Sequence, residues 1–276
     1  MKAKWLKPMA AKPYRADRTT FPALVQPKFN GIRIEWDGVE AYTRTPRAAK
    51  PHVQTMLHAF VPKLPEGWVL DGELLLPRGF SFQQTESAVK KENEHSPLLY
   101  YAIYDVDMRD NPEVPFWSRW DNLNCWYPGL SVELRKHMIL STCFTVNHAE
   151  SVDHWLNTWI GSGYEGAIVR ERNAVYRHGS SGRALQKYKK HLDAEFEIVG
   201  VKEATGKDAG TAVFICKMPN SDETFDVRPM GTFARRKDYW DNRADLIGKP
   251  LTVKYWDTFD SGVPQFGQGI AVRDYE

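Results

Sequence analysis

Residues 32–43 read IRIEWDGVEAYT, and this stretch sets the beginning of the fold. Ile32, Ile34 and Trp36 alternate with polar residues, an Asp-Gly pair follows, and the alternation then resumes. Such alternation is typical of a strand with one buried face, and Asp-Gly supplies turn residues that tolerate positive φ. The stretch therefore predicts a β-hairpin.

Apolar residues with helical spacing follow the hairpin in two places, at 53–64 and at 152–160. Each stripe predicts a core-facing helix. Strand-like runs lie at 68–76, 98–106, 143–146 and 164–170. Interspersed strands and helices predict an α+β domain over residues 1–190. Within this domain the segment 111–128, rich in Pro, Trp and Asn, is interpreted as an irregular surface excursion.

The remaining residues, 191–276, have a different pattern. Five short strand-like runs begin near residues 196, 212, 224, 251 and 268, and one helical stretch lies at 232–240. Five strands and a helix in so short a segment favour a small barrel of the OB type, although the spacing also allows a sandwich.

The composition is that of an ordinary globular protein, with 276 residues, 42% hydrophobic and 26% charged. No apolar run reaches the length of a membrane span, and no apolar segment follows the basic N-terminus, so we expect neither a membrane anchor nor a signal peptide. Three widely spaced cysteines disfavour a disulfide framework or a zinc site and fit a reducing compartment. We therefore expect a cytoplasmic location, in a bacterial or phage-infected cell.

The net charge of +2 hides an asymmetry between the two parts. Residues 1–190 contain 26 basic and 20 acidic residues, whereas residues 191–276 contain 11 and 15. A polyanion is therefore expected to bind mainly the first part.

Six short motifs contain the residues that could take part in binding or catalysis. In chain order they are KFNGIR (28–33), TRT (43–45), DGE (71–73), YAIYD (101–105), YEGAIVR (164–170) and LQKYK (185–189). An acidic pair inside an apolar strand is costly unless it binds a cation or hydrogen-bond donors. Lys187 and Lys189 are two residues apart, so on a strand they share one face and repel each other unless an anion lies between them.

Together these motifs resemble motifs I, Ia, III, IIIa, IV and V of the covalent nucleotidyltransferases, the superfamily of ATP-dependent DNA ligases, RNA ligases and mRNA capping enzymes. The closest resemblance is to the compact two-domain DNA ligases of viruses and phages. It implies an adenylation (nucleotidyltransferase) domain of antiparallel sheets and helices over residues 1–190, followed by an OB-fold β-barrel domain over residues 191–276.

The resemblance also implies how ATP is bound. Lys28 is expected to be the nucleophile that takes AMP from ATP, and Lys187 and Lys189 are expected to contact the α-phosphate. The residues expected to bind the rest of the nucleotide are Gln26 (adenine edge), Tyr104 (stacking on the base), Glu73 (ribose hydroxyls), Arg33 (phosphate) and Arg273 (pyrophosphate).

Two further roles follow from the resemblance. Arg44 is expected to bind the 5′-phosphate of a DNA nick, and Glu165, with Glu73 as a second candidate, is expected to bind Mg²⁺, which prefers carboxylate and phosphate oxygens. A lysine attacks only as the free amine, and its usual pKa of about 10.4 leaves little free amine at neutral pH. We expect the charges of Lys187 and Lys189 and of bound Mg²⁺ to lower the pKa of Lys28.

The sequence departs from the family pattern in two motifs. Motif I usually reads KxDG, but residue 30 is Asn, which removes a carboxylate. Motif VI usually reads RxDK, and here only Arg273-Asp274-Tyr275 represents it, without the lysine.

The predicted function is an ATP-dependent DNA ligase that seals nicks in double-stranded DNA as a monomer, with ATP and Mg²⁺. Two alternatives remain open on the residues alone. An RNA ligase or a capping-type nucleotidyltransferase would share the motifs, and Asn30 with the incomplete motif VI would also fit a nucleic-acid-binding protein that has lost catalysis.

Overall fold

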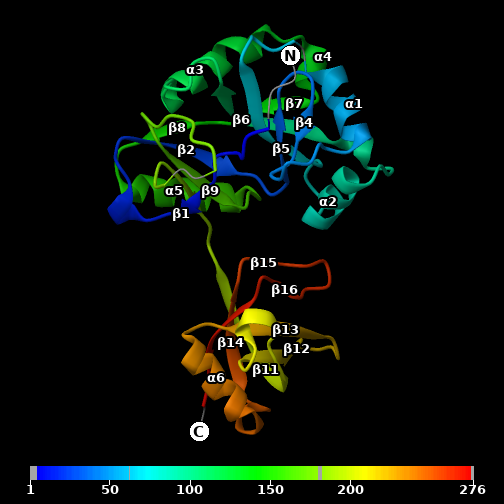
Figure 1. Cartoon of the computed structure of the whole chain (residues 1–276), viewed down its shortest axis with the longest axis vertical. Coiled ribbons are helices and arrows are strands. Elements are labelled where there is room, and N and C mark those ends of the chain that lie inside the picture. Colours follow the sequence, from blue (N-terminus) through cyan, green and yellow to red (C-terminus); the bar gives the residue numbers. More distant parts are fainter. Residues whose placement is uncertain (1–4, 62, 180–181, 275–276) are drawn as a thin grey trace. The chain divides into compact units, whose positions relative to one another are not determined.

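The computed structural model describes residues 5–61, 63–179 and 182–274. The chain forms two compact units whose boundary lies between Lys189 and Lys190 (Figure 1). Each unit has hydrophobic core clusters of its own. No helix within the described ranges is both long enough and apolar enough to cross a membrane.

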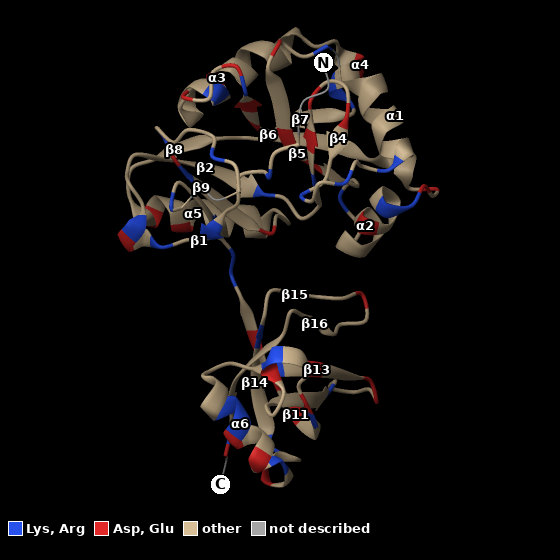
Figure 2. Cartoon of the chain, in the orientation of Figure 1, with Lys and Arg blue, Asp and Glu red and all other residues tan. Residues whose placement is uncertain are grey.

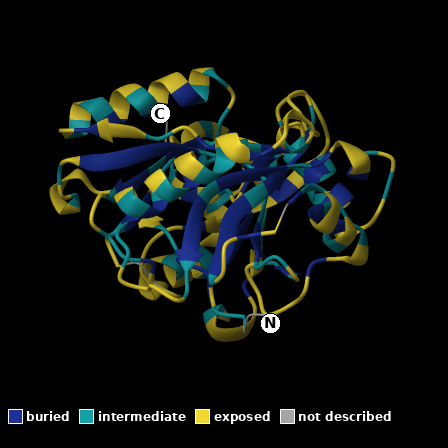
Figure 3. Ribbon diagram, turned by 90° about the horizontal axis from the view of Figure 1, so that it is seen from above, coloured by how far each residue is buried: buried dark blue, intermediate teal, exposed yellow. Residues whose placement is uncertain are grey.

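In the described part of the first unit, the strands form two five-stranded sheets. One has the order β1 (Lys12–Pro13), β10 (Leu185–Tyr188), β9 (Gly166–Glu171), β2 (Ala23–Lys28), β8 (Phe144–Val146). The other has the order β4 (Ala41–Tyr42), β3 (Ile32–Trp36), β5 (Trp68–Leu75), β6 (Tyr100–Met108), β7 (Met138–Leu140). The helices are α1 (Pro51–Phe60), α2 (Phe82–Lys90), α3 (Phe116–Trp126), α4 (Val132–Arg135) and α5 (Ala149–Gly161). In Figure 3 the central strands are largely buried and the helices expose one side, as expected of helices that cover sheets.

The predicted hairpin is confirmed, with a shorter second strand. Trp36 of β3 pairs with Ala41 of β4. Asp37 Oδ1 accepts hydrogen bonds from the backbone N–H groups of Val39 (2.8 Å) and Glu40 (2.6 Å). The side chain of Asp37 thus closes a four-residue loop in place of the expected two-residue turn.

The helix expected over 53–64 ends earlier, at Phe60. Val61 is extended, with φ −95° and ψ 116°, and it precedes a proline, which disfavours helical geometry in the residue before it. Leu64 lies beyond the end of the helix but is buried in the same core cluster. The apolar pattern therefore predicted a buried residue correctly, although not its helical conformation. The second expected helix is α5, with Val152, Leu156 and Trp159 buried.

The interpretation of residues 111–128 as an irregular excursion was wrong, because Phe116–Trp126 forms the helix α3. Its buried residues are Phe116, Arg119 and Leu123. The middle residue of this stripe is an arginine whose guanidinium forks onto Asp105 at 2.9 and 3.0 Å. Because a charged residue occupies a core position, the apolar residues of this segment did not show helical spacing.

The second unit is a closed five-stranded barrel with the order β11 (Leu192–Glu203), β12 (Ala212–Lys217), β13 (Thr224–Pro229), β17 (Gln268–Val272), β14 (Pro250–Tyr255). β11 pairs with both β12 and β14, and β13 pairs in parallel with β17. Helix α6 (Phe233–Asp241) lies between β13 and β14 in the chain, and the short strands β15 (Asp257–Thr258) and β16 (Pro264–Gln265) precede β17. This is the architecture of an OB fold, so the α+β fold class with an OB barrel is confirmed and the sandwich alternative is not.

Candidate active site

Strand alternation presents one row of polar side chains from the first sheet to a cavity. Ala23 and Val25 of β2 pack in the core that includes α5, so Gln26 and Lys28 of the same strand face the opposite side. On this side lie Ile168 and Arg170 of β9 and Leu185 and Lys187 of β10.

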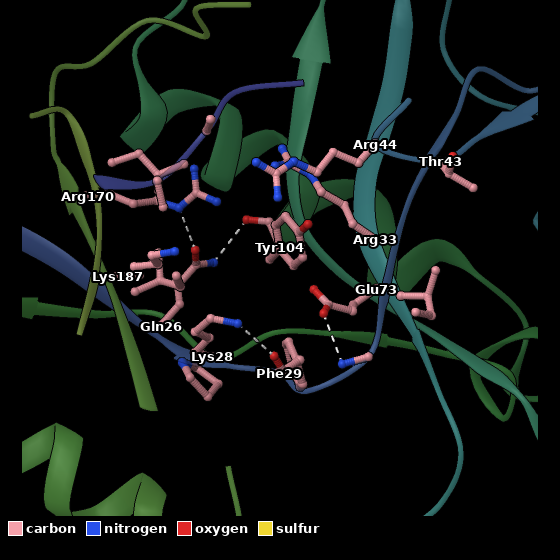
Figure 4. A pocket seen from close by; sticks show the side chains of 17 residues that line it. Gln26, Lys28, Phe29, Arg33, Thr43, Arg44, Glu73, Tyr104, Arg170 and Lys187 are labelled. Atoms are coloured by element: carbon pink, nitrogen blue, oxygen red, sulfur yellow. Dashed lines mark hydrogen bonds between the residues drawn. The ribbon is translucent and has the colours of Figure 1, made fainter. Parts of the chain in front are cut away.

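The second sheet contributes the other wall of the cavity in the same way. Ile34 and Trp36 of β3 are buried in the main core, which places Arg33 on the cavity side, opposite Glu73 of β5. The cavity has a volume of about 410 Å³ (Figure 4). Predicted site residues that line it are Gln26, Lys28, Arg33, Arg44, Glu73, Tyr104 and Lys187.

The remaining predicted residues lie elsewhere. Glu165 and Lys189 do not line the cavity, but both are tied to Lys28: the Glu165 carboxylate accepts a hydrogen bond from Lys28 Nζ and forms an ion pair with Lys189. Arg273 belongs to the barrel, where its Nε donates to Thr252 Oγ1 at 2.8 Å and lies 3.5 Å from Glu195 Oε1. Tyr275 of the incomplete motif VI lies outside the described residues.

Lys28 has the environment of a lysine prepared for attack. Burial is the largest cause that lowers the pKa of Lys28. The carboxylate of Glu73 raises this pKa, and the positive charge of Arg33 lowers it. Burial penalises the ammonium form, so a larger fraction of Lys28 is the free amine at neutral pH. The charges of Lys187 and Lys189 were expected to lower this pKa, but burial is the largest cause and the cation that contributes is Arg33.

Lys187 and Lys28 nevertheless repel each other. The pKa of Lys187 is lowered by its partial burial, then by the charges of Lys28 and of Arg44. Three cations therefore converge on one part of the site, which indicates an anionic ligand at this point. Lys189 does not join them, because its ammonium is bound to Glu165.

Glu73 is held by the backbone of motif I. Its Oε1 accepts a hydrogen bond from the Gly31 N–H at 3.0 Å. A Cβ atom on Gly31 would collide with the carbonyl oxygen of Leu74, so glycine is needed for the close approach of two strands. The close approach that Gly31 permits is therefore an approach to protein backbone. Burial raises the pKa of Glu73, and the nearby charge of Lys28 opposes the rise.

Arg33 is already bound by protein groups. Its guanidinium donates to Asp71 at 2.8 and 2.5 Å and to the Met9 carbonyl oxygen at 2.6 Å. Asp71 also accepts from the Tyr176 hydroxyl at 2.7 Å. The buried acidic pair of the DGE motif is thus satisfied by donors, and the fork of Arg33 is directed at Asp71. Figure 2 shows Asp and Glu residues, in red, within strands of the first unit.

Tyr104 lies between two guanidinium groups. The carbon atom Cζ of Arg33 is 5.9 Å from the centre of its ring, and that of Arg170 is 5.8 Å away. Gln26 donates from Nε2 to the Tyr104 carbonyl at 3.0 Å and accepts at Oε1 from Arg170 Nε at 2.7 Å. Tyr104, Gln26 and Arg170 therefore form one connected group at the cavity (Figure 4).

The prediction of site residues missed Arg170, Asp105 and Arg119. Asp105 is fully buried, and both arginines are ion-paired with it. Burial alone would raise the pKa of Asp105, but the positive charges of Arg119 and Arg170 outweigh it and lower the pKa. The signal was present in the sequence, since an aspartate within the apolar strand of motif IIIa needs a cationic partner.

The residues that could hold Mg²⁺ are carboxylates from separate strands. Within residues 5–61, 63–179 and 182–274, no cluster of three His, Cys, Asp or Glu side chains could bind a metal by itself. Glu165 and Glu73, each close to Lys28, supply hard oxygen atoms that fit Mg²⁺ only if substrate phosphates and water complete its coordination.

A buried glutamate near the site gives a prediction about stability. Glu35 is 2% exposed, its Oε1 lies 3.3 Å from the Tyr176 hydroxyl oxygen, and it faces the charge of Asp71. Burial, and then the negative charge of Asp71, raise the pKa of Glu35 to about 8. The unfolded chain ionises near the ordinary value of 4.5, so ionisation of Glu35 lowers stability as the pH rises from about 4.5 to about 8.

We expect Glu35→Gln to stabilise the protein at pH 8 by about 1–3 kcal/mol and to have little effect at pH 5. Urea unfolding at pH 5, 6.5 and 8 measures this, with Glu66→Gln, a change at an exposed glutamate, as the control. A gain of equal size at all three pH values would show that the charge of Glu35 is not its cause.

Comparison with known proteins agrees with this geometry. A sequence model described as the ATP dependent DNA ligase domain matches residues 8–189. A DNA ligase of African swine fever virus is 27% identical over 98% of this chain and 69% of its own length. A solved Lig E DNA ligase superimposes with a TM-score of 0.79 at 24% identity, covering 96% of this chain and 98% of its own. The Chlorella virus DNA ligase-adenylate superimposes with a TM-score of 0.58 at 24% identity, covering 98% and 99%.

Proposed function

The chain belongs to the family of ATP-dependent DNA ligases, and from this premise we propose that it seals nicks in double-stranded DNA through an AMP adduct on Lys28. The named relatives are DNA ligases, and they give no support to an RNA ligase or a capping enzyme. The protein uses ATP, and the reaction passes AMP through a lysine.

A single observation carries the choice of Lys28. Lys28 lines the cavity between the two sheets, burial is the largest cause that lowers its pKa, and Glu73, Arg33 and Lys187 line the same cavity. A nucleophilic amine, a carboxylate that can accept ribose hydroxyl groups and cations that can bind phosphate are the groups that adenylylation requires.

Three displacements at phosphorus follow from this arrangement. The free amine of Lys28 attacks the α-phosphorus of ATP, a P–N bond forms, the P–O bond to the β-phosphate breaks so that pyrophosphate leaves, and one proton of the amine passes to solvent. The 5′-phosphate of the nick then attacks the same phosphorus, a P–O–P bond forms, the P–N bond breaks, and the nitrogen of Lys28 takes up a proton from solvent and leaves as the amine. Finally the 3′-hydroxyl attacks the 5′-phosphorus, its proton passes to solvent, and AMP leaves. Lys187 offsets the negative charge that builds up on the α-phosphoryl group in the first displacement.

Further parts of the proposal concern the ion and the assembly. Mg²⁺, held by Glu165 or Glu73 with the phosphates, would neutralise phosphate charge when bound. We also propose that Arg273 acts in the adenylylation step, that the protein works as a monomer, and that it acts in the cytoplasm.

Labelled ATP tests the proposal. The protein is incubated with α-labelled ATP or GTP and Mg²⁺ and analysed by denaturing electrophoresis, and sealing is then measured on a nicked DNA duplex and on a nicked RNA duplex. We expect a labelled protein with ATP, and sealing of the DNA nick. Labelling by GTP alone, or sealing of RNA alone, would contradict the proposal.

Arg44 is exposed at the rim of the cavity, in the loop after β4. A guanidinium can bind a terminal phosphate in bidentate fashion. We expect Arg44→Ala to leave adenylylation of Lys28 almost unchanged and to slow AMP transfer to the 5′-phosphate roughly tenfold to a hundredfold. Adenylylated protein mixed with nicked duplex in the absence of ATP measures this transfer.

The matched control is Arg47→Ala, which removes an exposed arginine three residues away that does not line the cavity. If the Arg44→Ala variant transfers AMP as fast as this control, Arg44 does not bind the nick.

A further inference from the structure

The side-chain amide of Gln26 is fixed in one of its two orientations. Nε2 donates to the Tyr104 carbonyl at 3.0 Å, and Oε1 accepts from Arg170 Nε at 2.7 Å (Figure 4). A carbonyl oxygen only accepts hydrogen bonds and a guanidinium only donates them. Rotation of the amide by 180° would therefore place donor against donor and acceptor against acceptor. Both neighbours specify that the oxygen of Gln26 faces Arg170.

Arg170 is itself held firmly. Its Nη1 donates to Asp105 Oδ2 at 2.7 Å, and its guanidinium carbon lies 4.5 Å from the centre of the Phe116 ring. Asp105 is fully buried and is also bound by the fork of Arg119. Arg170 is only 4% exposed, so solvent does not compete for its donors. The orientation of Gln26 thus depends on a buried and rigid ion cluster.

The fixed amide has a consequence for a purine in the cavity. Besides the two bonds above, a glutamine amide has one more N–H and one more lone pair on oxygen, and Gln26 lines the cavity. Adenine carries a 6-amino donor beside a ring nitrogen that accepts, and this pair matches an amide that offers oxygen and N–H side by side. Guanine carries an oxygen at position 6, which would face the oxygen of Gln26. A freely rotating amide would serve both bases.

We propose that Arg170 is a specificity-determining positioning residue, which fixes the amide of Gln26 so that the cavity accepts adenine nucleotides and rejects guanine nucleotides. The inference rests on the proposed function, in which this cavity binds ATP. Sites that hydrogen-bond a polar group reject an analogue strongly when buried polar atoms are left unmatched.

Nucleotide analogues test the proposal on the unaltered protein. The rate of adduct formation on Lys28 is measured with ATP, GTP, inosine triphosphate and 2,6-diaminopurine riboside triphosphate. The base of the inosine nucleotide has the 6-oxygen of guanine without its 2-amino group, and diaminopurine has the 6-amino group of adenine with that 2-amino group. We expect rejection of GTP and inosine triphosphate on the order of a thousandfold, and use of the diaminopurine nucleotide within about tenfold of ATP. Inosine triphosphate used as well as ATP would overturn the proposal.

Variants then separate positioning from a purely structural role. Arg170→Met leaves Asp105 paired with Arg119, so no buried carboxylate loses all its partners. We expect the preference for ATP over inosine triphosphate to fall at least about tenfold in this variant, because only the Tyr104 carbonyl then holds the amide of Gln26 in its orientation. The matched control is Arg172→Met, which removes an exposed arginine just beyond β9 that does not line the cavity, and it should keep the preference of the unaltered protein.

A purely structural role of Arg170 would give a different pattern of rates. If Arg170→Met lowers the rates with both nucleotides by the same factor and leaves their ratio unchanged, Arg170 only supports the fold and the proposal is wrong. If this variant does not fold, the analogue series on the unaltered protein still decides whether the amide is fixed. Failure of the proposed function is distinct, because no adduct would then form with any of the nucleotides.

Discussion

Lys28→Ala should abolish formation of the protein–AMP adduct while the protein stays folded. The ammonium of Lys28 pairs with Glu165, which keeps Lys189 as a second partner, so the change leaves no carboxylate without a cation. Loss of the nucleophile removes the only route to the adduct, and we expect ATP-dependent sealing to fall by at least about a thousandfold. Mass spectrometry of the intact protein after incubation with ATP measures the adduct.

A second substrate makes this prediction sharper. A duplex whose nick already carries AMP on its 5′-phosphate needs only the last displacement, in which Lys28 is not the nucleophile. We expect the Lys28→Ala variant to seal this duplex at a measurable rate. An AMP adduct that persists in the variant would contradict the assignment of Lys28, whereas loss of sealing on both substrates together with a lowered unfolding midpoint would show damage to the fold.

Lys187→Ala is expected to give the second largest effect, on the order of a hundredfold in the rate of adenylylation. Lys187 lies at the cavity, where the charges of Lys28 and Arg44 help to lower its own pKa. Its charge becomes favourable when the α-phosphoryl group gains negative charge, so the loss should appear in the chemical step. Single-turnover formation of the adduct at saturating ATP measures that step.

Affinity for DNA provides the contrast. We expect nicked duplex to bind the Lys187→Ala variant almost as tightly as the unaltered protein. Lys190→Ala, which removes an exposed lysine three residues further along the chain, is the matched control and should adenylylate at the normal rate. A Lys187→Ala variant that loses only DNA affinity would mark Lys187 as part of a solvated basic surface.

The fold could be predicted where the apolar pattern has a clear period. The hairpin after Lys28, helix α5 and the five strands of the barrel have uninterrupted alternation or helical stripes. Helix α3 could not be predicted in this way, because Arg119 occupies a core position and its favourable energy comes from Asp105, which is distant in the sequence. Ion pairs of this kind, formed between separate elements of the fold, produce no periodic pattern of apolar residues in the local sequence.

The site could be predicted as a set of residues, but its internal contacts could not. The motifs identified several of the residues that line the cavity, because strand alternation places every second side chain on one face, although Glu165 and Lys189 do not line it. They did not show that Asp71 occupies the fork of Arg33 or that Arg170 fixes the amide of Gln26. These contacts depend on how two sheets pack together.

The roles of the lysines show the same limit. Lys187 and Lys189 are equivalent by spacing, but β10 ends at Tyr188, so Lys187 reaches the cavity and Lys189 pairs with Glu165. The exact residue at which a strand ends is among the features that are hardest to predict from a sequence.

The most direct test of the central claim is a single turnover without free ATP. The protein is loaded with labelled AMP, freed of ATP and pyrophosphate, and mixed with excess nicked duplex and Mg²⁺, and peptide mapping shows which residue carries the label beforehand. We expect the label on Lys28, its transfer to the 5′-phosphate, and sealing of about one nick for each adenylylated protein with release of AMP. Label on another residue, or label that stays on the protein while the nick remains open, would contradict the account.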